Sequence, residues 1–102
     1  MSTAFPLTPI ELAAGRVVRM MSIGQDEFFR MLPGAVDLPL MHQGDGARGR
    51  GWTLEASVQP SLNIALLSLP QLRVQIDFPA RDPAHMHAFM ATFDRHFQRG
   101  GG

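Results

Sequence analysis

The segment from Gly44 to Gly51 holds the residues of this sequence most often associated with phosphate binding. Its glycines match the spacing G-x-G-x-x-G, in which backbone N–H groups hold a pyrophosphate at the start of a helix. A strand is predicted to follow from Trp52, so the motif lacks the helix that it requires. Arg48 and Arg50 remain candidate anion-binding residues, because a guanidinium donates paired hydrogen bonds to a phosphate or carboxylate. We predict a mobile glycine-rich loop that carries these two arginines.

The four histidines are the next candidates, because imidazole binds metals and transfers protons near neutral pH. His85, His87 and His96 fall in the last predicted helix, and His42 is distant in sequence. His85 and His96 are separated by about 16 Å along a helix, which is too far for one shared metal ion. No pair has the i, i+4 spacing that brings two rings together. The spacing favours solvated or half-buried histidines over a metal centre, and it leaves open whether any of the four has a role.

Catalytic chemistry has few candidates in this sequence. The chain has no cysteine, which excludes disulfides, thiolate metal sites and cysteine nucleophiles, and no G-x-S-x-G segment marks a serine nucleophile. Glu55 and Asp77 are expected on one face of a sheet with a strand between them, about 9–10 Å apart. We predict no catalytic residue and no bound cofactor. An enzyme would need a histidine and a carboxylate to converge in the fold.

Length and composition indicate one globular domain. The chain has 102 residues, of which 45% are hydrophobic and 18% charged, as in a typical folded protein. Nine arginines balance nine acidic residues, so no net field favours nucleic acid or an anionic membrane. No apolar run reaches the roughly 18 residues of a membrane span, and no signal peptide is recognised. We expect a cytoplasmic protein with flexible tails at residues 1–9 and 100–102 around a domain at 10–99.

Apolar periodicity predicts the first and last elements of this domain. The run from Gly15 to Ile23 indicates a strand, and a short helix follows it and ends at Pro33-Gly34. A modest second strand covers residues 38–43. The last helix follows Asp82-Pro83, where an N-cap side chain precedes a proline, and it carries one apolar stripe. The stripe consists of Met86, Phe89, Met90, Phe93 and Phe97.

Three further strands are predicted between these elements. Residues 52–59 and 72–78 alternate apolar and polar side chains, and residues 62–69 form a mostly apolar run. The connecting turns are predicted at Pro60-Ser61 and Pro70-Gln71, because proline is frequent in turns and interrupts the hydrogen bonds of a strand.

The predicted order of elements indicates an α+β fold, in which both helices cover one face of an antiparallel sheet. The order β-α-β-β-β-β-α resembles that of the TATA-binding-protein-like and helix-grip families of folds, and the resemblance is one of element order alone. The alternative is a ferredoxin-like sandwich, in which residues 38–43 form only a loop.

The predicted turns determine which side chains lie beneath the helices. Trp52, Leu67 and Val74 are expected on the helix-facing side. The opposite, open face then carries a row of three aliphatic side chains between two polar rows, and an apolar strip with a polar rim is typical of a contact surface. The residues of the open face that we predict to bind a partner or ligand are Leu62, Ile64, Leu66, Arg73, Gln75 and Asp77.

The sequence is compatible with two functions of different kinds. The first is a non-catalytic interaction module that binds through the open face, as a homodimer or with another protein. The second is a small-molecule binder that holds an anionic ligand between the sheet and a helix, with Arg48, Arg50 or Arg73 as its anchor. A buried pocket of roughly 300 Å3 or more with an arginine at its mouth would favour the second, and its absence would favour the first. We predict neither nucleic-acid nor membrane binding, since the arginines are dispersed and the open face lacks aromatic side chains.

Overall fold

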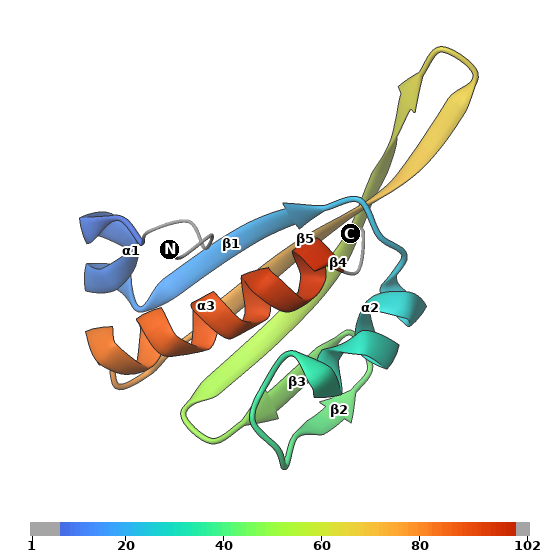
Figure 1. The fold of residues 1–102 in the computed structure, drawn as a ribbon. Coiled ribbons are helices and arrows are strands. Elements are labelled where there is room, and N and C mark those ends of the chain that lie inside the picture. Colours follow the sequence, from blue (N-terminus) through green and yellow to red (C-terminus); the bar gives the residue numbers. More distant parts are fainter. Residues whose placement is uncertain (1–6, 100–102) are drawn as a thin grey trace.

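The computed structural model describes residues 7–99 as an α+β protein with a five-stranded sheet (Figure 1). The elements in chain order are α1 (Pro9–Ala14), β1 (Arg16–Met21), α2 (Gln25–Met31), the 3-10 helix η1 (Leu32–Gly34), β2 (Met41–Gln43), β3 (Gly46–Gly49), β4 (Trp52–Ile64), β5 (Leu67–Asp77) and α3 (Pro83–Arg99). The tail predicted at 100–102, and residues 1–6 of the tail predicted at 1–9, lie outside the described residues.

The first helix begins before the predicted start of the domain. Thr8 and Glu11 form a capping box: Thr8 Oγ1 accepts a hydrogen bond from the Glu11 N–H at 3.1 Å, and Glu11 Oε1 accepts one from the Thr8 N–H at 2.8 Å. Leu7, just before it, is buried in the core. Gly15 ends the helix with φ +66°, and a Cβ there would lie 2.7 Å from the Phe78 carbonyl oxygen. Residues 7–9 therefore belong to the folded part.

The sheet confirms the predicted fold class. Its strands follow the order β1-β5-β4-β3-β2, and every neighbouring pair is antiparallel. β3 pairs with residues 52–55 of β4, and β1 pairs with residues 72–77 of β5. Beyond these contacts β4 and β5 continue as a two-stranded ribbon that extends past the rest of the sheet (Figure 1). The presence of β2 also removes the alternative in which residues 38–43 are only a loop.

The turns predicted at residues 60–61 and 70–71 are wrong. Pro60 lies inside β4 and Pro70 inside β5, and the chain turns at Ala65-Leu66, where Ala65 has φ +54°. The pairing register shifts after Gln59, so a β-bulge takes up an extra residue of β4. Both prolines lie in the ribbon, where each strand has a single neighbour in the described chain. A missing N–H can therefore point away from the ladder, and proline does not end the strand.

The loop predicted at Gly44–Gly51 is wrong over residues 46–49, which form strand β3. β3 lies between β2 and β4 and pairs with both. Glycine weakens a strand by itself, but it also allows close approach, and a Cβ at Gly49 would lie 2.5 Å from Trp52 Nε1. The total stays at five strands because the predicted strand 62–69 is divided between β4 and β5.

The core lies between one face of the sheet and helices α2 and α3. Phe28 of α2 stacks on Phe97 of α3 with ring centroids 5.0 Å apart, and Phe93 packs against Phe97 at 4.7 Å. These contacts place the two helices on the same side of the sheet, as predicted. The sheet residues buried beneath them are Val17, Met21, Trp52, Leu54, Ala56, Leu72, Val74 and Ile76.

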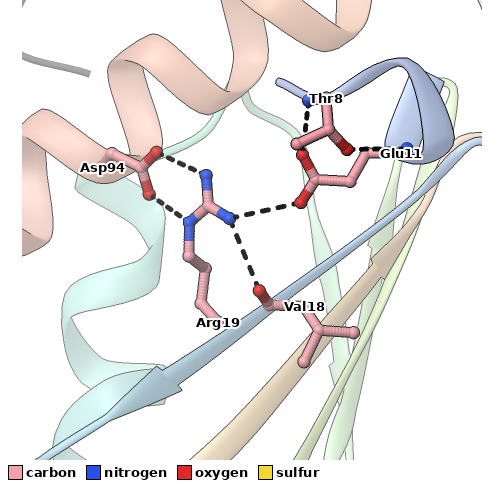
Figure 2. A network of polar contacts seen from close by, with 5 residues as sticks. All are labelled: Thr8, Glu11, Val18, Arg19 and Asp94. Atoms are coloured by element: carbon pink, nitrogen blue, oxygen red, sulfur yellow. Dashed lines mark hydrogen bonds and ion pairs between the residues drawn. The ribbon is translucent and has the colours of Figure 1, made fainter. Parts of the chain in front are cut away.

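A charged pair joins β1 to α3 at the edge of this core (Figure 2). The two carboxylate oxygens of buried Asp94 accept hydrogen bonds from Arg19 Nε at 3.0 Å and from Nη2 at 2.9 Å. Arg19 Nη1 lies 3.8 Å from Glu11 Oε2 and donates to the Val18 carbonyl oxygen at 3.4 Å. The network therefore links α1, β1 and α3, and its bidentate geometry offsets the cost of burying the carboxylate.

Candidate interaction surface

A β-hairpin arm projects from the body of the protein (Figure 1). We define the arm as residues 58–71, the paired ends of β4 and β5 with the turn between them. Two cross-strand pairs of aliphatic residues occupy one side of it. These pairs, which we call the apolar arm face, are Leu62–Leu69 and Ile64–Leu67. Asn63 and Ser68 form the pair between them and lie on the other side, so the arm is amphipathic.

The apolar arm face is open to solvent. The exposed fraction is 47% for Leu62, 52% for Ile64 and 64% for Leu67. Leu66, at the turn, is fully exposed. In the described part of the chain, α2 and α3 cover the body of the sheet and leave the arm bare (Figure 1). Four large aliphatic side chains are thus held in water by a segment that contributes little to the core.

The position of these side chains corrects the prediction in two ways. Leu67 is exposed and does not lie beneath the helices, and Val58 and Ala65 are exposed with it, because the arm extends beyond both helices. In addition, no separate strand lies between the two polar rows, because β4 and β5 are direct neighbours. The aliphatic residues therefore lie farther along the arm than the polar residues, and not between them. By alternation along β5, Leu67 and Leu69 continue the open face of the sheet that carries Arg73.

The sequence does contain a signal for this arm. The segments Leu62-Asn63-Ile64 and Leu67-Ser68-Leu69 each place a polar residue between two aliphatic ones, and they are symmetric about Ala65-Leu66. Such symmetry about a two-residue connection is typical of a β-hairpin. Pro60 and Pro70 on either side compete with this signal, because proline is also frequent in turns.

The arm carries no charge. No charged residue occurs between Glu55 and Arg73, a stretch that includes both strands of the arm and its turn. The chain as a whole is 18% charged. Contact between two arms is therefore not opposed by repulsion between like charges.

The polar part of the open face is a row of hydrogen-bonded side chains. Arg73 Nη1 donates to Gln75 Oε1 at 3.1 Å, and Gln75 Nε2 donates to Asp77 Oδ2 at 3.1 Å. Arg16 Nε donates to Asp77 Oδ1 at 2.7 Å. Partial burial would raise the pKa of Asp77, but the hydrogen bonds from Arg16 and Gln75 and the charge of Arg16 together lower it. Arg73, Gln75 and Asp77, which we predict to bind a partner or ligand, therefore form one hydrogen-bonded row in the isolated chain.

Glu55 and Asp77 lie on neighbouring strands, and not on either side of a third strand as predicted. No strand separates them, because β4 and β5 are adjacent and Glu55 lies opposite Gln75. Asp77 is engaged by Arg16 as described above. The local chemistry of this carboxylate is that of an ion pair on an ordered polar surface.

The two candidate anion-binding arginines line different cavities. Arg48 borders a cavity of about 500 Å3 along β2 and β3, where its Nη2 lies 3.8 Å from Met41 Sδ. Arg50, in the turn before β4, lines a cavity of about 620 Å3 together with Asp37 and His85. The two guanidinium groups therefore do not converge on one ligand, and anion binding by either stays a prediction.

The histidines lie apart from one another in the fold. Three of them pack against phenylalanine rings: His42 on Phe29, His85 on Phe78 and His96 on Phe97, with ring centroids 3.9, 5.6 and 5.4 Å apart. His87 is exposed on α3. Within residues 7–99, no three side chains of histidine, aspartate or glutamate are placed to hold a metal ion. Each of these three rings is therefore held in place by an aromatic neighbour.

Comparison with known proteins finds no family model that matches this chain and no curated protein with a similar sequence. None of the helices between residues 7 and 99 combines the length and the apolar character that crossing a membrane requires.

Proposed function

We propose that this protein is a non-catalytic interaction module that self-associates through the apolar arm face. The observation that supports the proposal is the projecting arm, which exposes two aliphatic cross-strand pairs and Leu66 on a segment without charges. An apolar patch of this kind commonly marks a protein–protein contact. A second copy supplies a matching surface, because a twofold interface brings the same apolar patch from both subunits together.

The strand edges of the arm are poorly suited to binding, which favours contact through the side-chain face. Pro60 in β4 and Pro70 in β5 lack a backbone N–H. Prolines on edge strands are a common means of preventing edge-to-edge pairing with another chain. The apolar arm face has no such protection.

Transfer free energies indicate a weak dimer. Burying a half-exposed aliphatic side chain contributes about 1 kcal/mol, and burying the fully exposed Leu66 about 2 kcal/mol. The total for two arms is on the order of 10 kcal/mol, against an association cost of about 4–15 kcal/mol. At the lowest cost the net gain is about 6 kcal/mol, or a dissociation constant of about 40 µM, so we expect a value between about 40 µM and 1 mM.

Substituting Ile64 with aspartate is expected to weaken the association strongly. Sedimentation equilibrium of the parent should show a reversible monomer–dimer equilibrium over about 10 µM to 1 mM. The Ile64→Asp variant should associate at least about tenfold more weakly, because the dimer would bury a charge among aliphatic side chains. Its circular dichroism and melting temperature should match the parent, since Ile64 lies outside the core.

Two further variants control this experiment. Asn63→Asp adds the same charge on the other side of the arm and should dimerise like the parent. Replacing residues 60–70 with Asn-Gly joins the paired residues Gln59 and Gln71 by a favoured two-residue turn and should give a stable monomer. A parent that remains monomeric at all concentrations, or an Ile64→Asp variant that associates like the parent, would contradict the proposal.

A second candidate function is binding of a small anionic ligand beside Arg50. The cavity of about 620 Å3 that Arg50 lines is within the range of ligand sites, and His85 lies in the same wall. Asp37 also lines this cavity and opposes an anion, so we rank this function second.

Titration with inorganic phosphate and with small carboxylates, followed by amide chemical shifts, tests this second function. Saturable shifts are expected at Gly51 and His85, and Arg50→Gln should remove them, whereas Arg48→Gln should leave them unchanged because Arg48 lines another cavity. Linear shifts without saturation, or equal effects of the two substitutions, would count against it.

A further inference from the structure

We infer that the two arms of the dimer pair in opposite directions, face to face, about a twofold axis perpendicular to them. This inference rests on the proposed self-association and adds the arrangement of the partner, which is a second copy of this chain. The axis passes near the Asn63–Ser68 pair, because that pair lies midway between the two pairs of the apolar arm face. Leu62 and Leu69 of one copy then lie over Ile64 and Leu67 of the other.

The distribution of charge along the open face favours this antiparallel arrangement. Moving from the arm toward the body, the open face passes from aliphatic residues to uncharged polar ones and then to Arg73, Glu55 and Asp77. If the arms pointed in the same direction, the charged rows of the two bodies would lie one over the other, and each charged residue would come close to its own copy. Pairing in opposite directions keeps the charged rows of the two bodies apart.

The polar row of the body gives a second reason. Arg73, Gln75, Asp77 and Arg16 are already hydrogen-bonded to one another. A parallel dimer would have to remove water from this row and would gain one contact between the two Leu66 side chains. An antiparallel dimer leaves the row in water, and it lays each Leu66 over the uncharged arm segment near Gln71 of the other copy.

The two arrangements predict very different distances between the bodies. Thr53 lies opposite Asp77, nine residues along β5 from Ser68. At about 3.3 Å per residue, Thr53 is about 30 Å from the axis, so the two copies of Thr53 are about 50–60 Å apart in the antiparallel dimer. In a parallel dimer the two copies face each other, and their separation falls below about 25 Å.

Spin labels placed on single engineered cysteines can measure these distances, because the chain has no cysteine of its own. Thr53→Cys carries the label that tests direction. Asn63→Cys carries a second label near the axis, on the outer side of the arm, and should give a distance of about 20–30 Å in either arrangement. Double electron–electron resonance of the intact chain, at a concentration where sedimentation shows dimer, is the measurement.

We expect a short distance from the Asn63 label and a long one from the Thr53 label. Short distances from both labels would overturn the antiparallel arrangement and leave the self-association in place. No dipolar coupling from the Asn63 label, in a sample that sediments as a dimer, would place the interface away from the arm and overturn the proposed self-association through the apolar arm face. If the Asn63 label shows no dipolar coupling and its mobility falls only when neutral phosphatidylcholine vesicles are added, the partner is a lipid surface and both proposals are wrong.

Discussion

Replacing Asp94 with alanine is expected to lower the free energy of unfolding by about 3–5 kcal/mol. The carboxylate is buried in α3 and accepts two hydrogen bonds from Arg19, whose side chain is 19% exposed. Without Asp94 the guanidinium loses its bidentate partner and keeps the long contact with Glu11 at 3.8 Å and the hydrogen bond to the Val18 carbonyl oxygen at 3.4 Å. The remaining positive charge would be largely desolvated and uncompensated, and this residual charge accounts for most of the expected loss.

Urea denaturation followed by the fluorescence of Trp52, the single tryptophan, measures this effect. The double variant Arg19→Met with Asp94→Leu should recover most of the lost stability, because it removes both charges together and fills the same space with apolar atoms. Glu11→Gln should cost less than about 1 kcal/mol, since that ion pair is long and partly exposed. If Asp94→Ala lowers the free energy of unfolding by less than about 1 kcal/mol, the Arg19 guanidinium is solvated by water and the prediction is wrong.

Replacing Phe28 with alanine is expected to lower the free energy of unfolding by about 3–5 kcal/mol. Phe28 is fully buried and is the main contact of α2 with α3, where it stacks on Phe97 at 5.0 Å and lies 6.2 Å from Phe93. The short helix α2 cannot move into the space that the phenyl ring leaves without losing its other contacts, so a cavity remains.

Urea denaturation measures the effect of Phe28→Ala. Phe28→Leu should have a smaller effect, and Ile10→Ala, at an 81% exposed position of α1, should stay within about 0.5 kcal/mol of the parent. The folded Phe28→Ala variant should self-associate like the parent, because the arm lies beyond the helices (Figure 1). If Phe28→Ala changes the dissociation constant of the dimer as well as the free energy of unfolding, the dimer is formed by the body and the arm is not the interface.

Proline alone does not locate the turn of the arm. Pro60 and Pro70 flank an apolar run, and a proline beside such a run predicts a turn in most sequences. Proline ends a strand only where its missing N–H would have bonded to a neighbour. Which neighbours exist at those positions depends on where β3 and β1 stop pairing, and that is a property of the assembled sheet.

The same reasoning applies to Gly46–Gly49. Glycine has little tendency to form a strand alone, so the local sequence favours a loop. Once β2 and β4 lie on either side, their backbone groups supply the ladder and the segment becomes the fourth strand in the sheet order. The resulting division of Arg48 and Arg50 between two cavities follows from this strand.

Local patterns in the sequence determined the helices α2 and α3, strand β1 and the inward side of the sheet body, including Trp52 and Val74. These features repeat every two or every 3.6 residues, so a short window contains the information that sets them. The tertiary structure alone decided that the aliphatic side chains of the arm project into water, and that Arg19 meets Asp94 across 75 residues of chain. Both depend on which segments become neighbours, and no short window of sequence records that.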